Sequence, residues 1–146
     1  RPKEVKEEAI IVPQRPAHEV ALEKLERLRS ERLWQNGNVK EYHTLVSETL
    51  REYVERIFEI KTLEVTTDEI LQEYRLLNRR GDAAPGSSEL LADVLKRADL
   101  VKFARFEPLP EENEKSLNLA FEFVNLTTPL SAMPTQDQNP LHSEPL

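Results

Sequence analysis

The chain has no cysteine among its 146 residues and only three glycines. Without thiols it cannot form disulfides, thiolate zinc sites or iron-sulfur clusters, and it has no thiol nucleophile. The sequence also has neither a glycine-rich phosphate loop nor a GxSxG motif, the signatures of two common kinds of active site. These absences predict a protein that needs no cofactor.

The chain also lacks an excess of positive charge, because 27 Asp and Glu outnumber 20 Lys and Arg, for a net charge of -7. The basic residues alternate with acidic ones and do not form a stripe. Such a chain repels a phosphate backbone, so we expect no nucleic-acid partner. Short helices leave a helix-turn-helix nucleic-acid binder open as a hypothesis, which only a basic face on the folded surface would favour.

The sequence has no hydrophobic run long enough to cross a bilayer. Its longest uncharged stretch, 123–136, has 14 residues and is broken by Pro129 and Pro134, whereas a membrane helix needs about 20. The chain begins at Arg1 and carries no signal-peptide core. We therefore expect a fragment of a longer protein whose upstream part is missing.

The ten prolines are concentrated at the two ends, with three in 1–16 and four in 126–146. Proline and polar residues in such density are typical of segments that cannot build a core. This distribution predicts an extended linker over 1–15, a folded domain over 16–125 and a disordered tail over 126–146.

Apolar residues between these ends recur at helical spacing and predict an all-α fold, a single small bundle of about five helices. The first helix begins at Pro16 or Ala17 and is stopped by the residues 36–38. The longest, about 39–59, has the widest apolar face and is expected to be central, with Leu50 and Tyr53 in the core.

Capping signals place the other three helices. Thr66 and Glu69 form a predicted capping box, and Gly81 ends that helix. Ser87 or Ser88 is the predicted cap of the fourth helix. Pro110 opens the fifth, whose apolar stripe we predict as Leu117, Ala120, Phe121 and Val124.

No residue pattern points to catalysis or metal binding. His18, His43 and His142 lack the spacing of metal ligands, so we expect structural or surface roles for them. The carboxylates lie on solvated helix faces, where nothing raises a pKa for acid or base catalysis.

Two apolar features are candidates for partner binding. Trp34 either caps the core or is an exposed anchor. Phe103, Phe106 and Leu109 crowd into a proline-bounded stretch. They form either a loop tucked onto the bundle or an exposed apolar patch that a partner covers.

Four segments in order, 16–28, 33–60, 63–71 and 90–124, resemble a bacterial family of membrane proteins related to the BatD-like aerotolerance proteins. The similar region is the family's cytoplasmic helical domain. The resemblance implies an upstream transmembrane helix, a juxtamembrane linker over 1–15, and a location at the cytoplasmic face of the bacterial inner membrane. It carries no catalytic motif to transfer.

Proteins of this kind occur with MoxR-type AAA ATPases and von Willebrand A domain proteins, so the resemblance implies partners of those classes. Our first hypothesis is a non-catalytic protein-interaction module of a membrane-anchored protein. The alternative is an enzyme-regulating or ligand-binding helical domain with a cleft between the third and fourth helices.

Overall fold

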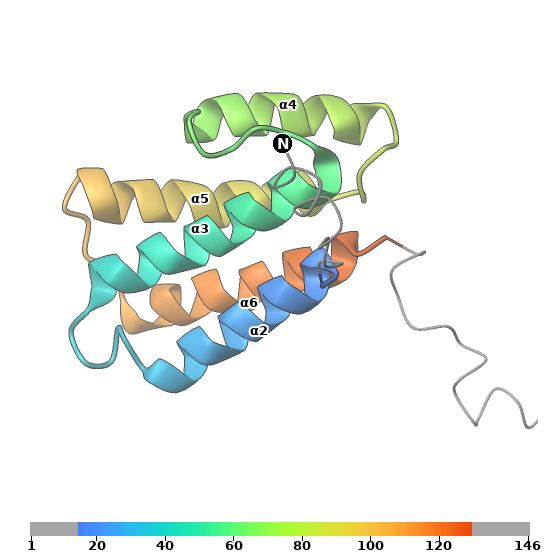
Figure 1. Ribbon diagram of the computed structural model, residues 1–146. Coiled ribbons are helices and arrows are strands. Elements are labelled where there is room, and N and C mark those ends of the chain that lie inside the picture. Colours follow the sequence, from blue (N-terminus) through green and yellow to red (C-terminus); the bar gives the residue numbers. More distant parts are fainter. Residues whose placement is uncertain (1–14, 130–146) are drawn as a thin grey trace, which may run out of the picture.

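The computed structural model describes residues 15–129, which form five helices (Figure 1). These are α2 (Ala17–Glu31), α3 (Val39–Phe58), α4 (Thr67–Arg79), α5 (Ser87–Phe103) and α6 (Pro110–Thr127). Residues 15–129 contain no strand, and the predicted all-α bundle is confirmed. The predicted linker and disordered tail lie outside the described residues, except for residue 15 and for 126–129.

Four helices, α2, α3, α5 and α6, lie side by side around the core, and α4 packs on α5 (Figure 1). The long helix α3 contacts α2, α5 and α6. Its predicted core residues Leu50 and Tyr53 are 0% and 2% exposed. The wide apolar face of α3 is therefore explained by neighbours on three sides, as expected for a central helix.

Helix α4 reaches the core through Ile70, Leu71 and Tyr74, which are all fully buried. Tyr74 also bonds to other helices. Its ring packs edge-on against Phe58 of α3, with ring centroids 5.0 Å apart, and also contacts Phe123 of α6. The hydroxyl of Tyr74 lies 2.7 Å from Oγ of Ser87. One aromatic side chain thus ties α4 to three other helices.

The predicted capping box of α4 is confirmed. The N–H of Glu69 donates to Oγ1 of Thr66, and the N–H of Thr66 donates to the Glu69 carboxylate. At the other end Gly81 adopts a left-handed conformation with φ of 82°. Here the N–H of Asp82 donates to the carbonyl of Leu77, which closes the helix in a Schellman motif.

The predicted cap of α5 is wrong, because Gly86 occupies the N-cap position and both serines lie buried inside the first turn. The Ser87 hydroxyl donates instead to the carbonyl of Ala84, at 2.6 Å. It also pairs with Tyr74. The packing of α4 against α5 therefore determines which groups the Ser87 hydroxyl bonds to, and Ser87 does not cap the helix.

Helix α2 ends at Glu31, earlier than predicted, because Arg32 adopts a left-handed conformation. A turn follows, in which Gly37 has φ of 93° and the N–H of Asn38 donates to the carbonyl of Leu33. The predicted stop at 36–38 is thus the end of this turn. It sets the start of α3.

Helix α6 continues to Thr127, so the predicted boundary of the folded domain at 125 is too early. Thr127 is buried, and its Oγ1 bonds both to the carbonyl of Phe123 and to the Tyr53 hydroxyl. Phe123 is fully buried, whereas the predicted stripe residue Phe121 is only partly buried. Within residues 15–129, every helix is too short or too polar to span a bilayer.

Candidate functional site

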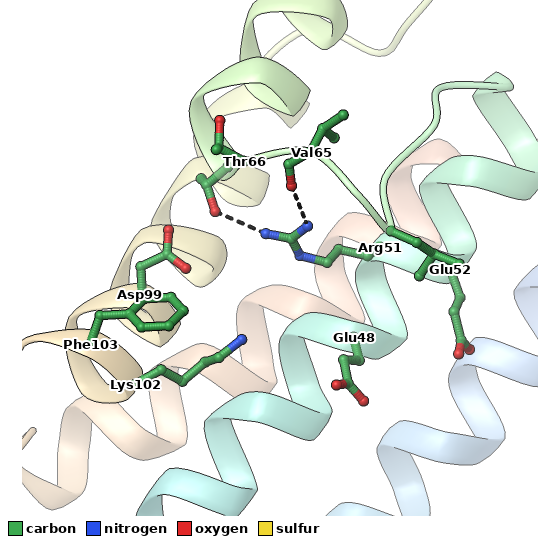
Figure 2. Close-up of a pocket in the computed structure, with 10 residues that line it drawn as sticks. Glu48, Arg51, Glu52, Val65, Thr66, Asp99, Lys102 and Phe103 are labelled. Carbon is green, nitrogen blue, oxygen red and sulfur yellow. Dashed lines mark hydrogen bonds between the residues drawn. The ribbon is translucent and has the colours of Figure 1, made fainter.

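The two most exposed large hydrophobic side chains of the described residues are Phe103 and Leu63, which are 76% and 71% exposed. Both line one hollow of about 710 Å³, bounded by α3, the start of α4 and α5 (Figure 2). We call this hollow the Leu63–Phe103 groove. Its other lining residues are Glu48, Arg51, Glu52, Val65, Thr66, Thr67, Asp99 and Lys102.

Arg51 holds the wall of the groove that carries Leu63. Its guanidinium reaches from α3 to the connection between α3 and α4, as Figure 2 shows. Its Nη1 donates to the carbonyls of Thr62, at 2.7 Å, and Val65, at 3.2 Å. Its Nη2 donates to Oγ1 of Thr67. These bonds fix a short connection that has no regular structure of its own.

A second set of bonds fixes Thr62, which is fully buried just before Leu63. The Thr62 hydroxyl lies 2.9 Å from the carbonyl of Arg51 and 3.0 Å from Oε1 of Glu55. Because its neighbour is held this firmly, Leu63 stands exposed on an anchored segment. Covering an apolar side chain on an anchored backbone costs less conformational entropy than covering one on a flexible loop.

The charged side chains that line the groove have both signs: Glu48, Glu52 and Asp99 are acidic, and Arg51 and Lys102 are basic. Glu52 pairs with Lys24 of α2, at 2.6 Å. Glu48 on α3 and Asp99 on α5 form no ion pair with any residue in 15–129. They lie on opposite sides of the groove in Figure 2. The ammonium of Lys102 lies 5.3 Å from the centre of the Phe103 ring, a cation-π contact.

The structure separates the residues predicted for one apolar patch. Phe106 is 36% exposed and lines a different hollow of about 430 Å³, beside Leu100. Leu109 is 62% exposed, precedes α6 and lines neither hollow. Of the predicted patch, the groove contains Phe103 alone.

Trp34 lies in the turn between α2 and α3, half-buried against the edge of the core. This is the placement that the core-capping alternative predicts for Trp34. Its carbonyl accepts a hydrogen bond from the N–H of Gly37, which helps to close the turn. Trp34 lines neither the Leu63–Phe103 groove nor the Phe106 hollow.

The Phe106 hollow is also where the predicted cleft between the third and fourth helices would lie, because Arg75 of α4 faces α5 across it. Two of its charged groups, Asp93 and Arg97, form an ion pair, whereas Arg75, Glu89 and Lys96 also line it and form none within 15–129. Arg97 lies 2.6 Å from Asp93 and donates to Oγ of Ser116, and Lys115 lies 3.7 Å from Asp93. The ligand-binding cleft at this place therefore stays a prediction.

His43 is buried between α3 and α6, and its Nε2 lies 2.7 Å from Oδ1 of Asn113. Burial lowers the pKa of His43 below 6.5; the hydrogen bond to Asn113 raises it and the charge of Arg97 lowers it. Such a neutral, hydrogen-bonded histidine has a structural role, as the sequence predicted. Residues 15–129 contain no cluster of three metal-ligating side chains.

Sequence reasoning missed Leu63, Glu48 and Asp99 as site residues. Leu63 carried a signal, since it is a large apolar residue in a short connection between two helices. Nothing local distinguishes Glu48 or Asp99 from the other carboxylates on solvated faces. Only the packing of α5 against α3 brings them to one groove.

Comparisons with protein-family models, with curated proteins and with solved structures return no match to this chain. The relation to the BatD-like family thus stays a prediction from the sequence segments.

Proposed function

We propose that this domain is a non-catalytic protein-interaction module that docks a protein partner in the Leu63–Phe103 groove. The observation that carries the proposal is the exposure of two large apolar side chains, Leu63 and Phe103, across one groove. Burying each in an interface would contribute about 1.5 to 3 kcal/mol. Apolar and aromatic anchors in a pocket, with charges at the rim, are typical of interface centres.

The same proposal places the module in a membrane-anchored bacterial protein, at the cytoplasmic face of the inner membrane. The support for this is the family resemblance of the four sequence segments. A MoxR-type AAA ATPase or a von Willebrand A domain protein is the proposed partner. Either would offer the folded surface or exposed segment that a groove with two apolar anchors requires.

Binding of these two purified partners to the full chain tests the proposal. We compare the wild type with Phe103→Glu and Leu63→Glu by biolayer interferometry. Leu76→Glu is the matched control, because Leu76 is a leucine that is 46% exposed on α4 and lies outside the groove lining. Circular dichroism checks that each variant melts near the wild-type temperature.

The two groove variants are expected to weaken binding at least tenfold, and Leu76→Glu is expected to bind like the wild type. If the wild type binds neither protein, the proposed partner classes are wrong. If the wild type binds and the groove variants bind equally well, the groove is not the docking site.

A further inference from the structure

We propose that the chain's own segment 10–12 docks in another hollow, between α2 and α3, and there covers Leu63. This hollow has a volume of about 460 Å³ and is bounded by α2, α3 and the connection that follows α3. We call it the Val20–Leu63 hollow, after its two apolar lining residues. The inference goes beyond the proposed function, because it needs no partner.

Arg15 marks the point where the chain enters the described fold. Its carbonyl accepts a hydrogen bond from Nη2 of Arg56 on α3, at 2.8 Å. Its guanidinium lies 2.6 Å from the carboxylate of Glu23 on α2. Because α2 and α3 run antiparallel, the start of α2 lies beside the end of α3 (Figure 1). Arg15 itself lines the Val20–Leu63 hollow, so the residues before it start from the rim of this hollow.

The apolar residues before Arg15 are close enough in sequence to reach the hollow. Val12 precedes Arg15 by three residues and Ile10 by five. An extended chain spans about 3.5 Å per residue, so Val12 reaches about 11 Å from Arg15 and Ile10 about 18 Å. So short a tether gives the segment a millimolar effective concentration at the hollow. This tethering favours the chain's own segment over a separate molecule as the occupant.

The order of the residues in this segment suits a hollow with two apolar side chains. Pro13 favours an extended backbone at Val12 and disfavours a helical one. Successive side chains of an extended segment point to opposite faces, so Ile10 and Val12 share one face. This pair matches the pair that the hollow presents, Val20 and Leu63. Leu63 is 71% exposed, so covering it with apolar side chains is favourable.

Charge neither selects nor opposes this docking. The hollow is lined by two basic and two acidic side chains, those of Arg15, Arg56, Glu52 and Glu55. The segment before it is balanced as well, with Arg1, Lys3 and Lys6 against Glu4, Glu7 and Glu8. Apolar contact and the short tether therefore carry the inference. Because Leu63 also lines the Leu63–Phe103 groove, a partner in that groove would have to displace the segment.

A nitroxide label on the full chain tests the docking, because a chain without cysteine can carry a single label through Ala9→Cys. In the ¹⁵N-labelled chain, the nitroxide broadens the NMR signals of amides that lie near it. An undocked tether also broadens amides beside Arg15, so three labelled chains are compared. One keeps the natural segment, and the second adds Ile10→Ser with Val12→Ser. The control adds Val5→Ser with Ile11→Ser, which removes two apolar side chains from the opposite face.

The broadening of the Leu63 amide is expected to fall about fivefold or more in Ile10→Ser with Val12→Ser, because the docked population falls. The control is expected to keep it. From the side of the hollow, Leu63→Glu in the chain with the natural segment should reduce the broadening at position 63 to the same extent. Leu76→Glu, on the exposed surface of α4, should leave the broadening of the Leu63 amide unchanged.

Equal broadening of the Leu63 amide in all three chains would overturn the inference, as would an equal loss in the control or no broadening there in any chain. Mixing the ¹⁵N chain without a nitroxide with a spin-labelled copy at natural isotope abundance tests the other occupant. Broadening of the Leu63 amide in this mixture would make a second copy the source of the segment and would also overturn it. No partner is present in these measurements, so their result is independent of whether a partner docks in the Leu63–Phe103 groove.

Discussion

Nε2 of His43 lies 2.7 Å from Oδ1 of Asn113, and this buried contact joins the first half of α3 to the first turn of α6. The amide oxygen can only accept, so the imidazole must donate from Nε2. His43 is 1% exposed, and burial lowers its pKa below 6.5. Protonation therefore costs more in the folded state than in the unfolded chain.

The first prediction is a loss of stability in mild acid. Because the folded state has the lower pKa, the unfolded chain binds this proton first as the pH falls through 6.5. The contribution of His43 is complete above that pH and falls until the folded pKa is passed. Urea unfolding should show a lower free energy at pH 5 than at pH 7.

The matched variant is His43→Gln, which keeps a donor but does not titrate. Its free energy of unfolding should change less between pH 7 and pH 5 than that of the wild type. Equal changes in the two proteins would assign the acid sensitivity to other groups.

The second prediction concerns Arg51, whose guanidinium holds the connection that carries Leu63. Arg51→Met leaves the carbonyls of Thr62 and Val65 without these donors, and we expect a loss of about 1 to 3 kcal/mol. Arg51→Lys should lose less, because one ammonium can still reach part of the set. Urea unfolding measures both, and a change under about 0.5 kcal/mol in Arg51→Met would contradict the anchoring of Leu63.

The third prediction uses residues with a left-handed backbone. Glu59 ends α3 with φ of 59°, where a side chain is strained. Glu59→Gly should raise the free energy of unfolding by about 0.5 to 1 kcal/mol, since glycine adopts this conformation without strain. The reverse change, Gly81→Ala at φ of 82°, should lower it by about 1 to 2 kcal/mol. Opposite signs in thermal or urea unfolding would refute this reading of the two helix ends.

The fourth prediction tests the core. Leu50→Ala should lower the free energy of unfolding by about 2 to 5 kcal/mol, because Leu50 is fully buried on the central helix. Leu126→Ala is the control, since Leu126 is 45% exposed on α6 and should change stability by under about 0.5 kcal/mol. Similar small effects at both positions would mean that α3 is not central.

Much of the fold follows from local sequence patterns. Helical periodicity predicted α3 and its neighbours, and the side chains of Thr66 and Glu69 sufficed to mark the start of α4. The errors come from contacts between distant residues. Ser87 fails as a cap because Tyr74 and Ala84 bind its hydroxyl, and α6 is prolonged because Tyr53 bonds to Thr127.

The candidate site was harder to predict for the same reason. Phe103 was identified from the sequence, but its neighbour in the groove, Leu63, is placed by hydrogen bonds from Arg51 on another helix. Phe106 lies in a different hollow from Phe103 because the chain turns between them. Arg105 has φ of 57°, and the N–H of Phe106 donates to the carbonyl of Leu100. No periodic pattern encodes such a turn.

An NMR titration tests the central claim most directly, using the ¹⁵N-labelled full chain and whichever purified partner binds it. The account predicts that the largest amide shift changes fall at Leu63, Asp99 and Phe103, on both sides of the groove. Changes centred on Trp34, or on Leu100 and Phe106, with the amides of Leu63 and Phe103 unmoved, would contradict it.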